Sequence, residues 1–136
     1  MKRYKNLLVL APLMILAGCG GSGNQTGLNI PYQGNWTGPW TSVTLGQSGT
    51  FTVQIFPNGS VIGTMVNTNQ NITGNVVGTV DNQGSLNWNS GMGAIGNYTM
   101  VGNTALASNG HQTVNFVLTW NGQGYATTAD LAPAAG

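Results

Sequence analysis

The stretch Phe51-Thr52-Val53-Gln54-Ile55-Phe56-Pro57-Asn58-Gly59-Ser60-Val61-Ile62-Gly63-Thr64 is the most informative part of the chain about its fold. Its first half alternates apolar and polar side chains, which is typical of a strand with one buried face. Pro57-Asn58-Gly59 then interrupts the alternation with residues that favour turns. A second run rich in β-branched residues follows at once, so the stretch predicts a β-hairpin.

The same rhythm recurs along the rest of the chain. Val114, Phe116, Leu118 and Trp120 alternate with mainly polar residues, and Asn-Gly pairs stand at 109–110 and 121–122. Asn-Gly readily takes the two positive φ angles of a type I′ hairpin turn. We expect nine strands, over residues 35–44, 49–56, 60–67, 72–80, 85–89, 95–101, 104–108, 112–120 and 124–129.

Eight or nine short antiparallel strands form either a barrel or a sandwich. Exposed sheet edges are usually protected by charged side chains, and this chain has very few, whereas closing the sheet removes the edges altogether. We therefore expect an all-β domain over residues 34–131, a small antiparallel up-and-down β-barrel of about eight strands, followed by a tail over 132–136. A β-sandwich is the alternative. A transmembrane barrel of about eight strands, each of about 9–11 residues, would need a longer chain.

A weak internal repeat places glycines inside the predicted strands. Val61-Ile62-Gly63-Thr64-Met65 recurs as Val76-Val77-Gly78-Thr79-Val80. A glycine inside a strand marks a bulge, a strongly coiled strand, or a place where a large ring lies against the backbone. The four tryptophans of the chain are available to fill such gaps.

The first predicted hairpins resemble the opening of avidin-type and lipocalin-type barrels. The matching residues are Gly34-Asn35-Trp36, Gly49-Thr50-Phe51-Thr52-Val53 and Gly59-Ser60-Val61-Ile62-Gly63-Thr64. The resemblance implies a meander barrel. It does not imply biotin binding, because avidins carry a ligand-binding asparagine where this chain has Gly38. Lipocalin function is not implied either, because the arginine that packs across the lipocalin tryptophan is absent.

The N-terminus has the pattern of an export signal. Lys2, Arg3 and Lys5 precede the apolar run of residues 7–16, which matches the n-region and h-region of a signal peptide and is shorter than the about 20 residues of a spanning helix. The run ends in Leu16-Ala17-Gly18-Cys19, which resembles the lipobox of bacterial lipoprotein precursors at all four positions. The resemblance implies cleavage after Gly18, which removes residues 1–18, and a covalent diacylglycerol on the Cys19 sulfur, with an N-acyl chain on its amine.

Such a lipid would anchor the protein stably to a membrane, since each buried methylene contributes about 0.8 kcal/mol. Gly20 stands where enteric lipoproteins carry the aspartate that retains them in the inner membrane, which favours the outer membrane of the cell envelope. Residues 19–33 are rich in Gly, Ser and Asn and are expected to form a flexible tether. A tether of about 14 residues reaches about 20 Å.

The charge distribution excludes several classes of function. Every lysine and arginine precedes Cys19, which leaves Asp81, Asp130 and His111 as the titratable acids and bases of the mature chain besides tyrosine. Without basic side chains, the counterion release that drives nucleic-acid binding is absent. The sequence has neither a nucleophile-elbow motif nor metal-ligand spacing, so we expect no enzyme, no metal and no cofactor. A hydrogen bond from His111 to either aspartate inside a cleft would argue for an enzyme.

Aromatic side chains surrounded by Asn, Gln and Thr suggest a site for a neutral ligand. Such rings stack on sugars, and amides and hydroxyls bind them without charge. Most of the tryptophans are expected to fill the barrel, and Trp40, after Gly38-Pro39, is the one most expected to be exposed. The candidate ligand-binding residues are Trp40, Trp36, Trp88, Trp120, Tyr98 and Tyr125.

These observations predict a lipid-anchored envelope protein with a non-catalytic structural or adhesive role. One alternative is a binding module that takes a small neutral ligand or a sugar into the barrel mouth, which requires a cavity of a few hundred Å³. Another is a self-assembling surface or matrix subunit, because the strands are rich in Asn, Thr and Gly and lack charged residues that discourage aggregation.

Overall fold

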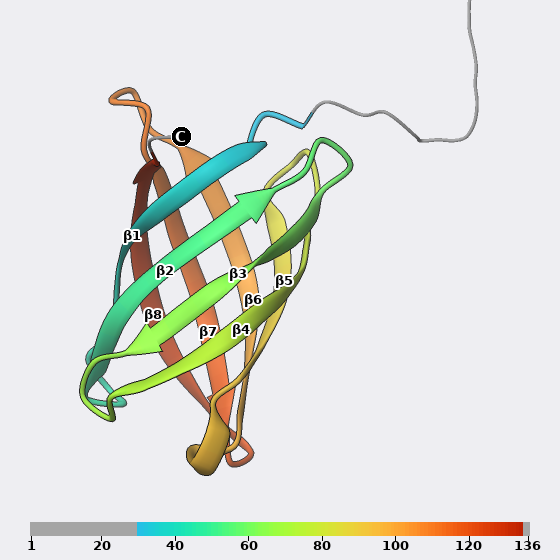
Figure 1. Cartoon of the computed structure of the whole chain (residues 1–136). Coiled ribbons are helices and arrows are strands. Elements are labelled where there is room, and N and C mark those ends of the chain that lie inside the picture. Colours follow the sequence, from blue (N-terminus) through green and yellow to red (C-terminus); the bar gives the residue numbers. More distant parts are fainter. Residues whose placement is uncertain (1–29, 135–136) are drawn as a thin grey trace, which may run out of the picture.

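The computed structural model describes residues 30–134. They form eight antiparallel strands closed into a barrel, in which each strand pairs with its neighbours in sequence and β8 returns to β1 (Figure 1). The strands are β1 (Gly34–Ser42), β2 (Gln47–Ile55), β3 (Ser60–Asn67), β4 (Ile72–Val80), β5 (Ser85–Gly91), β6 (Asn97–Leu106), β7 (Gln112–Trp120) and β8 (Gln123–Pro133). The predicted up-and-down barrel is confirmed, and the sandwich alternative is wrong because the sheet closes on itself.

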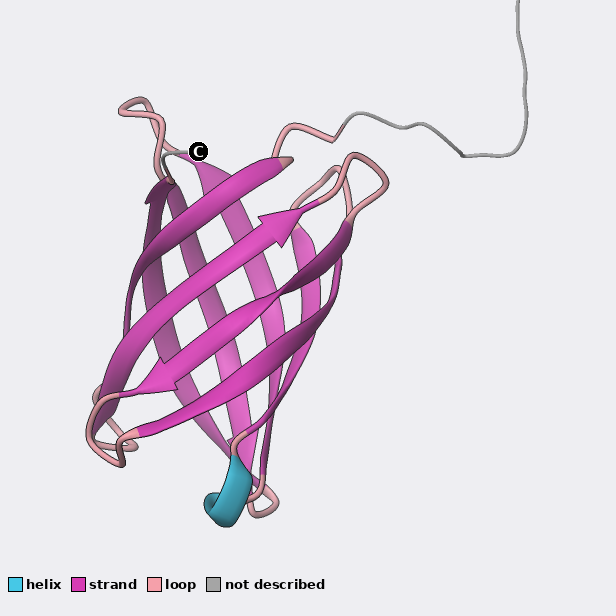
Figure 2. Ribbon diagram, in the orientation of Figure 1, coloured by secondary structure: helices cyan, strands magenta, loops and turns pink. Residues whose placement is uncertain are grey.

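The predicted break between strands 95–101 and 104–108 is wrong. Residues Asn97–Leu106 form one continuous strand, β6, preceded by the 3-10 helix η2 (Gly93–Ile95) at one end of the barrel (Figure 2). Gly102 lies between the two predicted strands and faces inward, and a Cβ on it would overlap the carbonyl oxygen of Asn115 on β7. The glycine therefore permits a close approach of two strands and does not end either of them.

The folded domain extends beyond both predicted boundaries. Ile30 and Tyr32, from the segment expected to be tether, are buried. The Ile30 amide donates to the Pro57 carbonyl at 3.3 Å, and Trp36 Nε1 donates to the Tyr32 carbonyl at 2.8 Å. At the other terminus β8 continues to Pro133. The predicted signal peptide (1–18), Cys19 and the tether up to residue 29 lie outside the described residues.

Side chains fill the interior of the barrel. Phe51 stands at the centre of the aromatic contacts, with ring centroids 5.6 Å from Trp88, 6.0 Å from Phe116 and 6.4 Å from Trp40. The pairs with Trp88 and Phe116 are edge-to-face, and such pairs add about 0.5–1.5 kcal/mol beyond the burial of their area. The other buried apolar side chains close around them: Ile30, Tyr32, Trp36, Val53, Ile55, Val61, Met65, Val76, Val80, Leu86, Met92, Tyr98, Met100, Val114, Leu118, Ala129 and Leu131.

Only one of the two Asn-Gly pairs forms the predicted type I′ turn. At 109–110 Gly110 has a positive φ of 86° but Asn109 does not, so the type I′ prediction is wrong there. Asn121 and Gly122, between β7 and β8, both have positive φ, at 51° and 76°, as a type I′ turn requires. Asp81 Oδ1 accepts hydrogen bonds from the Gln83 and Ser85 amides at 2.9 and 3.0 Å. Asp81 therefore caps the turn between β4 and β5.

Gly38-Pro39 does not end the first strand. β1 pairs with β2 without interruption through Gly38↔Phe51 and Pro39↔Thr50. The ladder to β8 instead skips these two residues, since paired positions are found at Trp36, Thr37, Trp40 and Thr41. Proline has no amide hydrogen to donate and is tolerated where a ladder bond is missing. The strand therefore continues past the proline, and Trp40 stays in register to face the interior.

Candidate functional site

The expected exposure of Trp40 is wrong. Its side chain is 1% exposed, and its Nε1 donates to the Val66 carbonyl at 3.0 Å. Trp36 and Trp88 are also buried, as expected. Because the strand alternation carries through Pro39, Trp40 falls on the inward phase of β1. None of these three rings offers a free face for stacking on a sugar.

Tyr98 is buried beside Trp40, and their ring planes are nearly perpendicular at a centroid distance of 6.5 Å. Asn67 Nδ2 donates to the Tyr98 hydroxyl oxygen at 2.9 Å. Burial raises the pKa of the Tyr98 phenol, and the hydrogen bond from Asn67 offsets part of that rise. The two polar groups satisfy each other inside the barrel wall.

Two of the candidate rings lie together at one mouth of the barrel. Tyr98 and Trp120 line a hollow of about 40 Å³ with Leu45, Gln47, Gln70 and Ile95. Trp120 is partly exposed, and its Nε1 donates to the Ile95 carbonyl at 2.6 Å, which ties the end of β7 to η2. A hollow of this size holds a few water molecules. A sugar or a drug-sized ligand needs about 300 Å³ or more.

Tyr125 lies apart from this mouth hollow. It is partly buried on β8, and its hydroxyl donates to Gln123 Oε1 at 3.4 Å. Of the six candidate aromatic residues, only Trp120 and Tyr125 thus retain exposed surface. The structure does not bring these six side chains together around one cavity.

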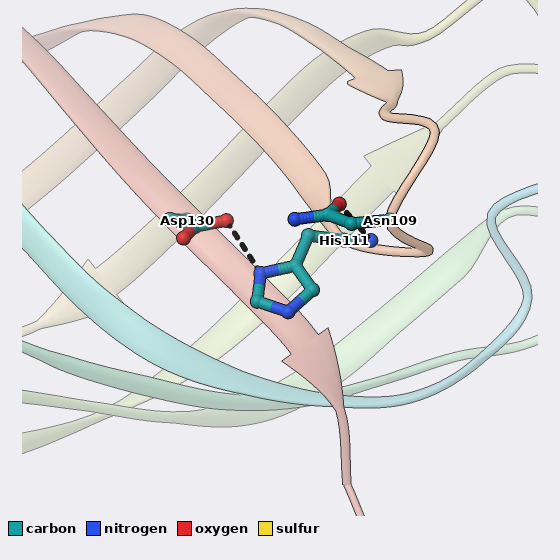
Figure 3. A network of polar contacts seen from close by, with 3 residues as sticks. All are labelled: Asn109, His111 and Asp130. Carbon is teal, nitrogen blue, oxygen red and sulfur yellow. Dashed lines mark hydrogen bonds and ion pairs between the residues drawn. The ribbon is translucent and has the colours of Figure 1, made fainter.

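His111 and Asp130 form the contact that would argue for an enzyme, but not in a cleft. Their Nδ1 and Oδ1 atoms are 3.0 Å apart on the outer wall, with side chains 35% and 61% exposed (Figure 3). Asn109 Oδ1 accepts a hydrogen bond from the His111 amide at 3.0 Å, so the histidine flanks the turn between β6 and β7. Neither residue lines the hollows described for this protein. Within residues 30–134, no cluster of three or more His, Cys, Asp and Glu suited to a metal is found.

The largest of these hollows lies on the outer wall, over β6, β7, β8 and β1. Its volume is about 570 Å³, which falls in the usual range of ligand sites. Its lining includes one apolar row that runs across three strands, in which Val101 pairs with Val117 and Val117 pairs with Ala126. Sequence reasoning missed these residues. Val101 and Val117 are about half exposed, and their place on the outward phase of two strands was the available signal.

A polar row runs beside the apolar one. Asn103 pairs with Asn115, Asn115 with Thr128, and Thr128 with Thr41 across the closure of the barrel. All four residues line the same hollow. Two smaller outer hollows, of about 400 and 370 Å³, lie beside the β4–β5 turn and over β1–β3. Of these three outer hollows, the one over β6, β7, β8 and β1 combines an apolar row with a polar row.

Comparison with known proteins adds no family to this description. No protein-family model, no curated protein and no solved structure gives a significant match to the chain. Among the described residues, no helix has the length and apolar character needed to cross a membrane. The fold defines the class: a small, closed, side-chain-filled antiparallel β-barrel.

Proposed function

We propose that this protein is an exported bacterial lipoprotein whose barrel is held at the cell envelope by a lipid on Cys19. The observation that carries the proposal is the lipobox Leu16-Ala17-Gly18-Cys19 directly after a basic and apolar signal. Cys19 is the only cysteine of the chain. A thiolate is the nucleophile that lipidation requires, and an unpaired cysteine is unusual in an oxidising exported compartment unless chemistry consumes it.

The entry point of the chain into the barrel agrees with such an anchor. The start of β1 and the end of β8 lie at the same end of the barrel (Figure 1). Ile30 and Tyr32, which precede β1, are buried. Ten residues separate Cys19 from Ile30. The average end-to-end distance of a flexible chain of this length is about 17–19 Å. Under this proposal, the end that carries residue 30 stays near the membrane, and the opposite rim is free to face away from it.

A non-catalytic structural or adhesive role is supported by what fills and covers the barrel. The interior is packed with apolar side chains, and the outer strand positions carry mainly Thr, Asn, Ser and Gln. A ligand in the barrel mouth is less well supported, because the hollow there is about 40 Å³. Assembly through sheet edges is also less well supported, since closure of β1 on β8 pairs both terminal strands.

The test of the anchor is the substitution Cys19→Ser in the full precursor, expressed in a bacterial host. We expect wild-type protein to label with palmitate and to fractionate with membranes after an alkaline carbonate wash. Cys19→Ser should lose the label and leave the washed membranes, whereas the neighbouring Ser22→Ala should behave as wild type. Unchanged membrane fractionation of Cys19→Ser refutes the lipid anchor.

Sorting between the two membranes is tested by Gly20→Asp. If the outer membrane is the destination, this variant should move to the inner-membrane fraction while keeping its palmitate label. Wild-type protein that is already in the inner membrane would overturn that part of the proposal and leave the anchor intact.

A further inference from the structure

We propose that the outer-wall hollow over β6, β7, β8 and β1 binds a short segment of a neutral polysaccharide. This site would give the proposed adhesive role a ligand. It rests on the proposed function, because the barrel must be exported to meet a polysaccharide. The mouth hollow, of about 40 Å³, is too small for a sugar ring.

The charge of the hollow selects against ionic ligands. Its lining residues carry no formal charge. Asp130 is the next outward position after Thr128 on β8 and borders the hollow without lining it, with His111 beside it at 3.0 Å, and Asp81 lies in the turn between β4 and β5. A phosphate, a carboxylate or an amine would lose hydration on entering and gain no counter-charge. A neutral ligand is therefore the class that the electrostatics of this surface fit.

The two rows of the hollow match the two kinds of surface that a sugar ring presents. The apolar row offers methyl groups to the C–H face of a pyranose; it consists of Val101, Val117 and Ala126. The adjacent polar row offers amides and hydroxyls to the hydroxyl groups of the sugar; it consists of Asn103, Asn115, Thr128 and Thr41. None of these four polar side chains takes part in the side-chain hydrogen bonds found within residues 30–134. By contrast, Thr37 and Thr52 on the β1–β2 face lie 3.3 Å apart and hydrogen-bond to each other. The donors and acceptors of the polar row are thus free for a ligand.

The span of the site favours several sugar units over one. Adjacent strands lie about 4.8 Å apart, so the four strands extend about 14 Å from β6 to β1. Val43 and Thr44, in the loop after β1, border the hollow at the rim opposite residue 30, and Val43 is 86% exposed. The site therefore opens toward the part of the barrel farthest from the proposed anchor.

A second copy of the chain fits this surface less well. A symmetric dimer places the same patch of both subunits face to face and requires that patch to complement itself. Two concave hollows leave a void between them, whereas a sugar chain is convex and fills one.

Binding at a single open hollow of this kind is weak, and many anchored copies on one cell surface raise the total strength through multivalency.

The experiment uses residues 19–136 with Cys19→Ser, which carries no lipid, so that failure of sugar binding is separate from failure of the anchor. Native affinity electrophoresis is run through gels containing dextran, soluble β-glucan, galactomannan or hydroxyethyl cellulose. We expect at least one polymer to retard the protein. Val117→Lys should weaken that retardation about tenfold, and Asn115→Ala should weaken it to a lesser degree.

Val77→Lys is the matched control. Val77 is 55% exposed on β4 and Val117 is 49% exposed on β7, and only Val117 lines the hollow. Retention of binding by Val77→Lys, with its loss in Val117→Lys, supports the site. The proposal is overturned if no polymer retards the wild-type protein or if both lysine variants weaken binding equally. It is also overturned if sedimentation shows a dimer that Val117→Lys dissociates, because the hollow is then a contact between copies.

Discussion

Gly78→Ala is expected to destabilise the barrel strongly, although it adds a single methyl group. Gly78 faces the interior on β4, beside Trp88 on β5. A Cβ built on Gly78 would lie 2.7 Å from Trp88 Cα and 2.8 Å from Trp88 Cδ1, and it would overlap the Asn87 carbonyl oxygen. Ordinary carbon contacts are about 3.5–4.0 Å. The neighbouring strand and the tryptophan ring must therefore both move by about 1 Å.

The expected loss of stability follows from these two displacements. Overpacking of a well-filled core costs about 1–3 kcal/mol. Moving the Trp88 ring also weakens its edge-to-face contact with Phe51, now at 5.6 Å, which is worth about 0.5–1.5 kcal/mol. We expect Gly78→Ala to lower the free energy of unfolding by about 2–4 kcal/mol. For a domain of about 100 residues this lowers Tm by roughly 10–20 °C.

The assay is urea unfolding followed by tryptophan fluorescence and by circular dichroism. Gly91→Ala is the matched control, since it is also a strand glycine, yet its added Cβ would meet only Asn97 Oδ1 at 3.6 Å. That variant should be as stable as wild type or more stable by about 0.4–1 kcal/mol, because alanine restricts the unfolded chain. If Gly78→Ala lies within about 0.5 kcal/mol of wild type, below the range for overpacking, the steric reasoning is wrong.

Two further predictions concern titratable side chains. Because burial raises the pKa of Tyr98, its stabilising effect is complete below the unfolded pKa of about 10 and is lost as the pH rises through the higher folded value. Tyr98→Phe should therefore reduce the loss of stability between pH 9 and pH 11, measured by urea midpoints, and an unchanged slope would contradict this prediction. His111→Ala should change the free energy of unfolding at pH 7 by less than about 1 kcal/mol, because its partner Asp130 is 61% exposed; a larger loss in the same assay would show that the pair has a structural role.

Individual residues show where sequence patterns predict structure well and where they do not. Alternation and turn residues predicted seven of the observed strands closely, because inward and outward positions follow directly from the period of two. The same patterns failed at Gly102 and at Gly38-Pro39. Both sites contain residues that usually interrupt a strand. Gly102 instead permits a close contact with β7, and Gly38-Pro39 coincides with a missing ladder bond to β8. Both features are defined by the neighbouring strands.

The outer hollow could not be predicted from local patterns for a related reason. The outward phase of Val101 and Val117 could be read from the alternation, but the hollow also needs Thr41 beside Thr128. Those two residues come from opposite ends of the barrel sequence. Their meeting depends on strand register and on closure, which no local pattern specifies.

The sequence by itself determined the all-β class, the turns, the near absence of charge after Cys19 and the lipobox that predicts an anchor. Each of these depends on neighbouring residues in the chain, so local composition and periodicity are sufficient. Only the tertiary structure decided that Trp40 is buried, that the mouth hollow is too small for a sugar, and that two rows of opposite polarity share one outer hollow. The burial of Trp40 depends on β1 continuing past Pro39 in register with β2. The outer hollow depends on the pairing of β1 with β8, because closure of the barrel sets which strands become neighbours.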